Sequence, residues 1–336
     1  MVSRLALSAL LLVAGVLHLA RPELFDPAIP FPWKWEINLF AGVLEILLGL
    51  GLWPARTRER AAQGTALWFL LLTPVHVYVA LEGIAMFGAD HPALLWGRTG
   101  LQAALFFWAL SLQETGWIIA QRWSEVLFLH YEVDGAELQR LVPYPIDRFE
   151  GKAVVSIVPF AMGRIRFPFL PPLPGLRQLL ELNLRTYVLI EGKPVVYFFT
   201  LDANHLIGVL VGRFGFGLPY RWRRLRLTHQ ARYRLEAQDL SIEAAVTTRA
   251  LDGAFQRWAT ERYALVTRYL GVDWIGEVEH PVWSLKEARL LSIDDAFSPP
   301  FLKLGPVLGA AYASELFVRF RPFRRVRLGV GPSIST

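Results

Sequence analysis

The stretch that decides the fold of the rear of this chain runs from Glu181 to Tyr220 and reads ELNLRTYVLIEGKPVVYFFTLDANHLIGVLVGRFGFGLPY. Its beginning alternates polar and apolar residues with a period of two, which is the pattern of a β-strand with two different faces. One face carries Glu181, Asn183, Arg185 and Tyr187, and the other carries Leu182, Leu184 and Val188. The polar face is either a solvated sheet surface or the inside of a polar pocket.

The same stretch predicts a β-hairpin followed by a helix. The sequence Glu191-Gly192-Lys193-Pro194 is typical of a turn, and the partner strand follows over Val195–Leu201. Asp202 and Asn204 then form a helix-start signal before HLIGVLVGRF.

Around this hairpin, the 336 residues divide into two parts of different composition. Up to Ala120 there are seven Lys or Arg and eight Asp or Glu, whereas the remainder carries 28 and 21. A nearly neutral, very apolar part therefore precedes a basic part, and we expect one domain over residues 1–120 and another over 121–336. The absence of Cys excludes disulfides, thiolate metal sites and a Cys nucleophile.

Four apolar segments predict that the front domain is an all-α transmembrane four-helix bundle: Leu5–Leu19, Leu39–Trp53, Thr65–Phe87 and Leu94–Ile119. The first is short against the roughly 20 residues that a bilayer core requires, and alone it would suit a signal peptide, but three more spans follow. A loop with Arg56, Arg58 and Arg60 places both termini in the cytoplasm by the positive-inside rule. We therefore expect a multi-pass protein of the plasma (inner) membrane.

Five polar residues lie at membrane depth in these segments: His18, Glu45, His76, Arg98 and Gln102. Ionisable groups in hydrocarbon are costly, so they usually face the bundle interior and pair. Arg98 and Gln102 share a helix face, and we expect Arg98 to pair with Glu45. Three alternatives remain: these residues serve a redox or proton-carrying role, or the pair only sets the helix register, or His18 and Arg98 lie near the membrane interface.

The segments GVLHLARPELFDPAIPFP, AGVLEILLGLGLW, PVHVYVAL and LLWGRTGLQAALFFWAL stand in this order within the front domain. Together they resemble the DoxX-like family of small four-helix membrane proteins, over about residues 1–118. The resemblance implies that His18, Glu45, Arg98 and Gln102 are the family's polar positions, while His76 stands where Asn is more usual. Because some DoxX-like proteins are associated with quinone-linked oxidation, it also implies a quinone as a cofactor candidate.

The rear domain is predicted to be α+β. Asp134 caps a short helix, Thr260–Leu270 predicts a longer helix, and Pro168–Pro174 predicts a Pro-rich loop. Further strands are expected at Glu125–Val133, Lys152–Met162, Arg224–Leu235, Leu240–Thr248, Gly276–Pro281 and Tyr312–Phe320. The sequence contains no P-loop, Gly-x-Gly-x-x-Gly or His-Glu-x-x-His motif.

The motifs FLHYEVDGAELQRLVP, GKAVVSIVPFAMG, LNLRTYV, YFFTLDA, GLPY, TERYALV and GEVEHPVWSL follow one another over residues 122–292. In this order they resemble the uncharacterised YqjF-like family of the acetoacetate decarboxylase superfamily, in a domain that extends to about residue 330. The resemblance implies a curved, mostly antiparallel β-sheet or barrel around a small-molecule cavity. It also implies that Glu181, Asn183 and Arg185 face into that cavity.

The chemistry of that superfamily does not transfer directly. Acetoacetate decarboxylase forms a Schiff base through a Lys that follows Gly-x-Pro, but here Tyr220 follows Gly217-Leu218-Pro219. The remaining candidates are Arg185 as a clamp for a carboxylate, Glu181 or Asp202 as acid or base, and Tyr220 as a donor. His130 and His280 are either ligand contacts or hydrogen-bonded structural residues. No metal site is predicted, and no residue is assigned as catalytic.

Two basic clusters, Arg221–Arg226 and Arg319–Arg327, invite a nucleic-acid interpretation, but no recognition motif accompanies them. Attraction to anionic lipid explains the same charge, and solvated strand faces are the plain alternative. We therefore predict membrane lipid and a small acidic ligand as partners and no nucleic acid, and leave the oligomeric state open.

Three functions fit these observations. The chain couples a membrane bundle that engages a quinone to a cytoplasmic carboxylate-binding domain, or it is a membrane-anchored lyase or hydratase acting on a small carboxylic acid, or it is a scaffold without chemistry.

Overall fold

The computed structural model describes residues 2–113, 116–168, 172, 178–237, 240–295 and 302–326. The chain forms two compact units, Met1–Ile118 and Ile119–Thr336. Most of the predicted Pro-rich loop, and Arg327 of the second basic cluster, lie outside the described residues.

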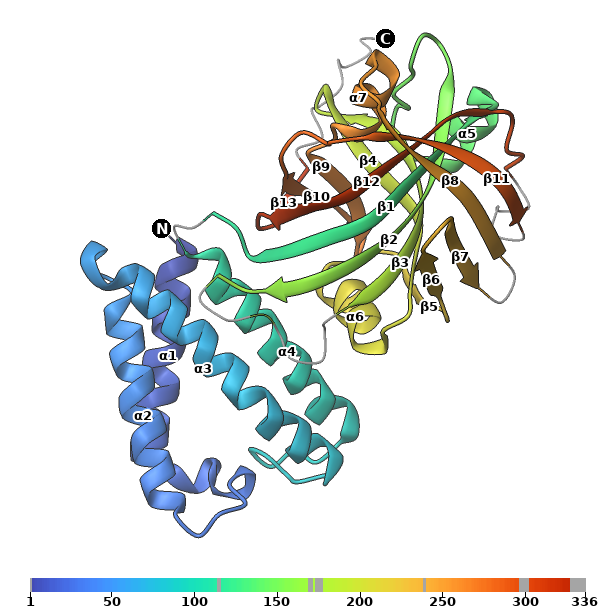
Figure 1. The fold of residues 1–336 in the computed structure, drawn as a ribbon. Coiled ribbons are helices and arrows are strands. Elements are labelled where there is room, and N and C mark those ends of the chain that lie inside the picture. The colour runs from blue at the N-terminus through green and yellow to red at the C-terminus, as the bar shows by residue number, and fades with distance from the viewer. Residues whose placement is uncertain are drawn as a thin grey trace, which may run out of the picture. The chain divides into compact units, whose positions relative to one another are not determined.

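The first unit consists of four helices, in agreement with the four apolar segments (Figure 1). They are α1 (Val2–Ala20), α2 (Lys34–Gly51), α3 (Ala55–Leu81) and α4 (Pro92–Ser111), with short 3₁₀ turns at Pro22–Leu24 and Asp26–Ala28. The prediction that Arg56, Arg58 and Arg60 lie in a loop is wrong. Pro54 lies at the N-cap of α3, so these arginines fall in the first turns of that helix.

Two glycines set how closely α1 and α2 pack. A Cβ atom on Gly15 would lie 2.7 Å from the Gly42 carbonyl oxygen, and one on Gly42 would lie 2.8 Å from the Gly15 oxygen. The two backbones therefore meet at small residues, which is the packing mode favoured by helices in lipid.

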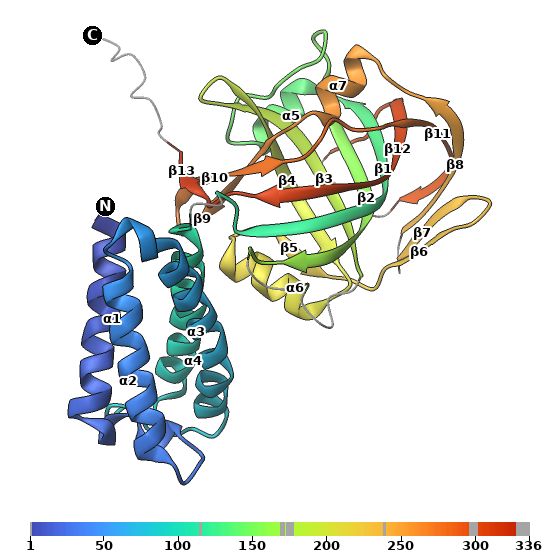
Figure 2. The ribbon, with the colours of Figure 1, turned by 60° about the vertical axis from the view of Figure 1, so that its left-hand side comes forward.

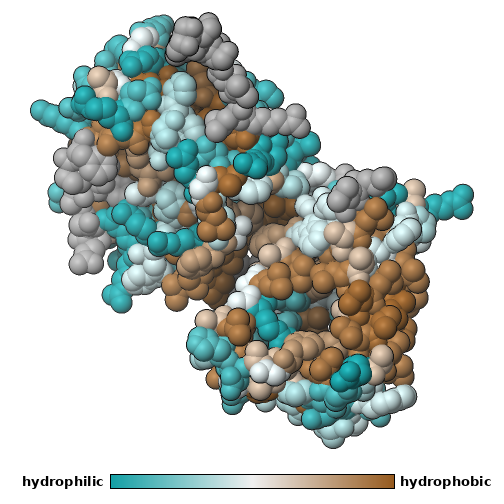
Figure 3. All heavy atoms as spheres, turned by 180° about the vertical axis from the view of Figure 1, so that it is seen from behind, coloured by the Kyte–Doolittle hydropathy of each residue, from teal (hydrophilic) through white to brown (hydrophobic). Residues whose placement is uncertain are grey.

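The first unit exposes apolar side chains and buries polar ones. Phe40, Leu47, Leu71 and Leu81 are all more than half exposed, while Ser8, Asn38, Glu45, Thr65 and Gln102 are buried. Figure 3 shows this apolar surface as brown along one flank of the unit. Two of its helices are long and apolar enough to cross a membrane: α1, over Ser3–Ala20, and α3, over Ala55–Leu81.

The second unit is built on one sheet, which has 13 strands in the part of the chain that the structure describes. Its order is β13-β10-β9-β4-β3-β2-β1-β12-β11-β8-β7-β6, with β5 beside β4, and the neighbours are antiparallel except β4–β5 and β4–β9. The strands are β1 (Ile119–Val133), β2 (Ala153–Arg166), β3 (Leu179–Ile190), β4 (Lys193–Ala203), β5 (Tyr220–Trp222), β6 (Arg226–His229), β7 (Tyr233–Ala237), β8 (Leu240–Ala250), β9 (Ala264–Tyr269), β10 (Val272–Glu279), β11 (Lys286–Asp295), β12 (Val307–Phe320) and β13 (Arg324–Arg325). Figures 1 and 2 show that the sheet is strongly curved, which confirms the predicted curved, mostly antiparallel α+β architecture.

The decisive hairpin forms as predicted. β3 and β4 are joined at Glu191 and Gly192, which both have positive φ, the backbone that tight two-residue hairpin turns require. Asp134 caps α5 (Gly135–Leu141) by accepting from the backbone N–H groups of Ala136 and Glu137.

Two predictions of secondary structure in the second unit are wrong. The stretch Thr260–Leu270 is not a helix, because α7 covers Ala254–Thr260 and the chain then enters β9. Val266 and Thr267 are β-branched, and burial between β4 and β10 stabilises the extended form. The single strand expected over Arg224–Leu235 is instead the hairpin β6–β7.

Each face of the sheet carries its own core. Leu127, Leu129, Leu182, Leu184 and Val188 lie in one cluster, together with residues of β7 and β8. Phe128, Val158, Phe160 and Tyr187 lie in the other, together with Ala259 of α7 and Trp283. The candidate site lies on this second face.

Candidate functional site

Neighbouring strands bring the predicted polar residues together in rows. His130 of β1 pairs with Ser156 of β2, which pairs with Arg185 of β3. Directly opposed residues point to the same face of a sheet, so these three side chains share a face. Glu181 and Asn183 lie opposite Phe160 and Val158 and therefore share that face.

This polar face is buried. Glu181, Asn183 and Arg185 are 4%, 3% and 8% exposed, and His130 and Ser156 are fully buried. The alternative of a solvated sheet surface is therefore wrong. We call the set Glu181, Asn183, Arg185, His130, Ser156, Tyr187 and Tyr220 the Arg185 cluster.

Tyr220 joins the cluster from β5, which runs parallel to β4. Its hydroxyl donates to Glu181 Oε2 at 2.6 Å. Burial raises the pKa of Glu181 to about 7, while the hydrogen bonds from Tyr220 and Asn183 and the charge of Arg185 act in the opposite direction. Burial, together with the Glu181 carboxylate, raises the pKa of Tyr220 well above its usual value, so the phenol is a donor.

Arg185 has no anionic partner among the described residues. Its guanidinium carbon lies 5.3 Å from the centroid of the Phe128 ring and 5.8 Å from that of Tyr187, and its Nε is buried without a hydrogen-bond acceptor. A buried guanidinium normally pairs with a carboxylate, because leaving an ion unpaired in a low-dielectric interior is costly.

His130 is held in place by two hydroxyls. Its Nδ1 lies 2.7 Å from Ser156 Oγ, which lies 2.7 Å from the Tyr187 hydroxyl oxygen. Burial and the nearby Arg185 charge lower the pKa of His130 to about 3, so the ring is neutral. Its Nε2 and the Asn183 Oδ1 are buried without partners. The face therefore holds unused donors and acceptors around Arg185.

Two of the predicted candidates lie elsewhere. Asp202 is opposite Leu182 and so points to the other face of the sheet, where it forms ion pairs with Arg221 and Arg223, each at 2.8 Å. Alternation along β4 separates the Asp202 side chain from the face that carries Glu181. His280 is 3.3 Å from the Arg262 carbonyl oxygen through Nε2 and stacks on Tyr263, outside the Arg185 cluster.

Arg262, which no sequence motif indicated, lies beside the Tyr187 ring. Its guanidinium carbon is 4.8 Å from the centroid of Tyr187, and its Nη1 pairs with Asp147 Oδ2 at 2.5 Å. Ser156 was also missed, although a Ser inside the apolar run AVVSIVPF is a detectable signal.

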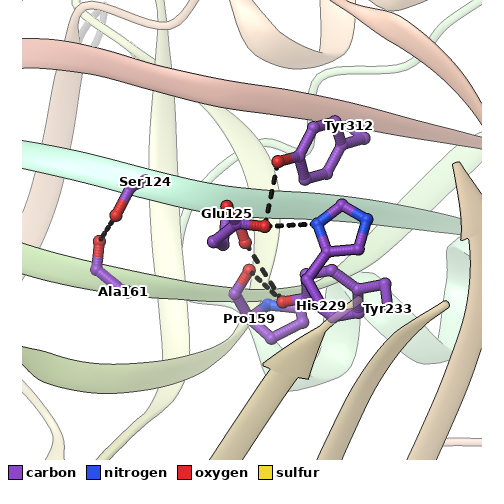
Figure 4. Close-up of polar contacts among 7 residues, drawn as sticks. All are labelled: Ser124, Glu125, Pro159, Ala161, His229, Tyr233 and Tyr312. Atoms are coloured by element: carbon purple, nitrogen blue, oxygen red, sulfur yellow. Dashed lines mark hydrogen bonds and ion pairs between the residues drawn. The ribbon is translucent and has the colours of Figure 1, made fainter. Parts of the chain in front are cut away.

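A second polar cluster, also missed, surrounds Glu125 on β1 (Figure 4). Glu125 Oε2 lies 2.5 Å from His229 Nδ1 and accepts from the Tyr312 hydroxyl at 2.9 Å. Tyr233 donates to the Glu125 carbonyl oxygen at 3.1 Å. Tyr233 and Tyr312 belong to the other core, so this cluster and the Arg185 cluster lie on opposite faces of the sheet. Glu125 also has a positive φ, and no motif in the sequence signals it.

In the helical unit the predicted Glu45–Arg98 pair is wrong. Glu45 Oε1 accepts from Trp68 Nε1 at 3.0 Å, and Glu45 Oε2 is 4.0 Å from His18 Nε2. Arg98 instead lies over the Phe87 ring at 5.2 Å. The pair fails because α3, with Trp68, supplies the nearer donor.

The other polar residues of this unit have separate partners. His18 Nδ1 lies 2.7 Å from Asn38 Oδ1, and Asn38 Nδ2 donates to Asp26 Oδ1 at 2.8 Å. Gln102 donates to the Phe69 carbonyl oxygen at 2.8 Å, and the His76 carbonyl oxygen accepts from Thr99. Asp26, Asn38, His18 and Glu45 thus form a row of polar contacts, and two of these residues, His18 and Glu45, were predicted from the sequence.

The described residues contain no group of three or more His, Cys, Asp or Glu that could hold a metal ion. Two surface hollows, of about 740 and about 1060 Å³, lie away from the Arg185 cluster, beside Lys152 and Lys303 and beside Arg268 and Arg324.

Comparison with known proteins identifies the second unit. Residues 120–313 match the family DUF2071, described as "Uncharacterized conserved protein", and residues 7–113 match DUF8561, described as a domain of unknown function. The uncharacterized protein YqjF of Bacillus subtilis (strain 168) is 33% identical over 237 residues, which cover 64% of this chain and 96% of that protein.

Solved structures with a similar course of the chain include the acetoacetate decarboxylase of Legionella pneumophila subsp. pneumophila, with 13% identity and a TM-score of 0.49 over 62% of this chain and 87% of that one. The enduracididine biosynthesis enzyme MppR complexed with pyruvate has 14% identity and a TM-score of 0.46, and the match covers 62% of this chain and 90% of that one. The DoxX-like resemblance of the front domain stays a prediction, whereas the YqjF-like one is confirmed. By the match over residues 120–313, the chain belongs to the DUF2071 family.

Proposed function

We propose that the second unit binds a small carboxylate-bearing ligand against Arg185, and that the helical unit anchors it in the plasma membrane. The observation that carries the first half is the buried guanidinium of Arg185, which has no ion-pair partner among the described residues. A ligand carboxylate would supply the missing partner through two parallel N–H···O bonds.

The groups around Arg185 suit the rest of such a ligand. Asn183 Oδ1 has no partner and can accept a hydrogen bond from a hydroxyl substituent. His130 Nε2 also has no partner, and it can bond a hydroxyl or, when it carries the ring proton, donate to a carbonyl oxygen. Phe128 and Tyr187 provide an apolar wall on which the guanidinium lies. The cluster therefore favours a short acid with one further polar group.

A membrane-anchored lyase or hydratase is the second candidate, and Glu181 favours it. A carboxyl group with a pKa of about 7 can both donate and accept a proton near neutral pH. Tyr220, which donates to that carboxyl group, occupies the position after Gly-Leu-Pro, so no Schiff base forms there. A scaffold without chemistry is the third candidate, and it leaves the unpaired Arg185 without a purpose.

The membrane half of the proposal rests on the helical unit. Its surface exposes many apolar side chains, its interior includes several buried polar residues, and α1 and α2 pack closely at glycines. We place α1 to α4 across the bilayer as a four-helix bundle with both termini in the cytoplasm. The row of polar contacts formed by Asp26, Asn38, His18 and Glu45 is then the place where a quinone or similar carrier would exchange protons.

Ligand binding is tested by isothermal calorimetry of the purified full chain against a set of two- to five-carbon acids. We expect Arg185→Ala to weaken binding roughly 100-fold, the size expected for a charge-assisted pair. Arg185→Lys should recover little, because Lys lacks the planar fork. Arg232→Ala, at an exposed arginine paired with Glu243, is the control and should bind normally.

Unchanged binding by Arg185→Ala would refute the proposal that a carboxylate binds at Arg185. The orientation is tested separately by a reporter fused after Thr336, which should be active only in the cytoplasm. Quinone-dependent turnover in purified membranes, and its loss in His18→Ala, would support the carrier role.

A further inference from the structure

The segment Leu206–Gly215, which follows the decisive hairpin, packs on the sheet by glycines. It consists of α6 (Leu206–Leu210) and a π-helical turn, η3 (Val211–Gly215). A Cβ atom on Gly208 would lie 2.8 Å from Leu179, and one on Gly212 would lie 2.3 Å from the Tyr220 ring. The two glycines are four residues apart, so one face of the segment contacts the domain closely.

The opposite face is apolar and exposed. Leu206, Ile207, Leu210, Val211 and Phe214 are each more than 40% exposed, and so is Trp222 of the adjoining β5. An exposed apolar patch of this kind marks an interaction surface. We call these six residues the α6 patch.

The charge around the α6 patch has a single sign. Between Leu206 and Arg226 the sequence has five Arg and no Asp or Glu. Arg213, Arg221, Arg224 and Arg226 are exposed, and the guanidinium carbon of Arg224 lies 6.0 Å from the centroid of the Trp222 ring. Arg221 and Arg223 share Asp202, which leaves the other arginines to set the sign of the surface.

We propose that the α6 patch inserts into the interface of an anionic membrane, with the surrounding arginines at the level of the lipid phosphates. An apolar helical face with Trp, flanked by basic residues, is the composition of interfacial segments. Its ten residues are too few to span a bilayer, which takes about 20. The arginines select lipid over an uncharged apolar partner.

This contact is additional to the proposed anchoring by α1 to α4, and it does not depend on the carboxylate site. It has one structural consequence. Gly212 lies against the Tyr220 ring, and the Tyr220 hydroxyl donates to Glu181. Movement of the segment at the membrane surface would therefore shift Tyr220 within the Arg185 cluster.

The chain contains no Cys, so one introduced Cys is a unique labelling site. We would label Leu210→Cys in the full chain with the fluorophore NBD and reconstitute it in phosphatidylcholine vesicles with and without phosphatidylglycerol. We expect a blue-shifted emission that headgroup-level spin-labelled lipid quenches, more strongly with phosphatidylglycerol. Ala136→Cys, on the exposed α5 at the far end of this unit (Figures 1 and 2), is the control and should stay water-exposed.

A second measurement uses residues 119–336 alone. The Bacillus relative is covered over 96% of its length by a match of only 64% of this chain, so a domain of this family exists without a helical unit of this size. In vesicle flotation, Leu210→Asp together with Phe214→Asp should lower affinity roughly 100-fold, from the apolar burial lost. Arg213→Gln should lower affinity about fivefold.

Three results would overturn the proposal. One is a water-exposed label at position 210, and another is a blue shift that no spin-labelled lipid quenches, which would mean that protein covers the patch. The third is equal flotation of the native and doubly substituted domain. The ligand titrations are done without vesicles, so failure here leaves the carboxylate proposal intact.

Discussion

Two buried arginines lie near the same ring, Tyr187, and they differ in what they contact. Arg262 pairs with Asp147 at 2.5 Å and donates through Nε to the Trp258 carbonyl oxygen at 2.6 Å. Arg185 has neither an ion pair nor a hydrogen bond among the described residues. The fold gives Arg262 an ion-pair partner and gives Arg185 none. We therefore interpret Arg262 as a structural charge and Arg185 as a charge that is available to a ligand.

The largest expected effect is on the paired arginine. Arg262→Ala should lower the free energy of unfolding of residues 119–336 by about 3 kcal/mol, because it leaves the Asp147 carboxylate without its buried partner. Urea unfolding followed by Trp fluorescence measures this. Arg232→Ala serves as the control at an exposed pair and should change the value by less than about 1 kcal/mol. A loss as small as the control's would erase the contrast between the two arginines.

The next expected effect is a pH dependence of stability. It arises because the charge of Arg185 offsets only part of the rise in pKa that burial causes at Glu181. The folded-state pKa of Glu181, about 7, lies above the unfolded value of 4.5. The stability that Glu181 contributes is therefore complete below pH 4.5 and is lost as the pH rises through 7, by at most about 3 kcal/mol. Urea unfolding between pH 5 and 8 measures the slope, and Glu181→Gln should flatten it. An identical slope in that variant would assign the titration to another group.

Tyr220→Phe should have a smaller effect on the free energy of unfolding, and it tests how the surroundings of Glu181 set its pKa. The variant removes the 2.6 Å hydrogen bond to Glu181, at a cost of about 1 to 2 kcal/mol. Because that bond favours the carboxylate, its loss should move the midpoint of the pH dependence upward. A midpoint that moves downward would mean that the phenol stabilises the protonated form.

The smallest effect is expected for Arg185→Met. Replacing a buried charge that has no partner by an apolar side chain of similar length should change the free energy of unfolding by less than about 1 kcal/mol, or raise it. The same variant should lose all stabilisation by the acid that binds the native protein, measured as the shift in thermal midpoint. Strong destabilisation without ligand would instead give Arg185 a structural role like that of Arg262.

Local pattern was enough to predict much of this fold. The period-two alternation from Glu181 to Val188 determined which side chains share a face of β3, and the Glu191-Gly192 turn determined the hairpin. The four apolar segments determined four helices, and Asp134 determined a helix start. Each of these features depends on residues within a few positions of one another.

Only the tertiary structure decided which faces meet. Pairing between strands placed His130 and Ser156 beside Arg185, sent Asp202 to the opposite face, and drew β9 out of a stretch that predicts a helix. Packing of α3 gave Glu45 the indole of Trp68 in place of Arg98. The register between distant strands and the approach of separate helices depend on buried contacts across the whole unit, and no short stretch of sequence contains them.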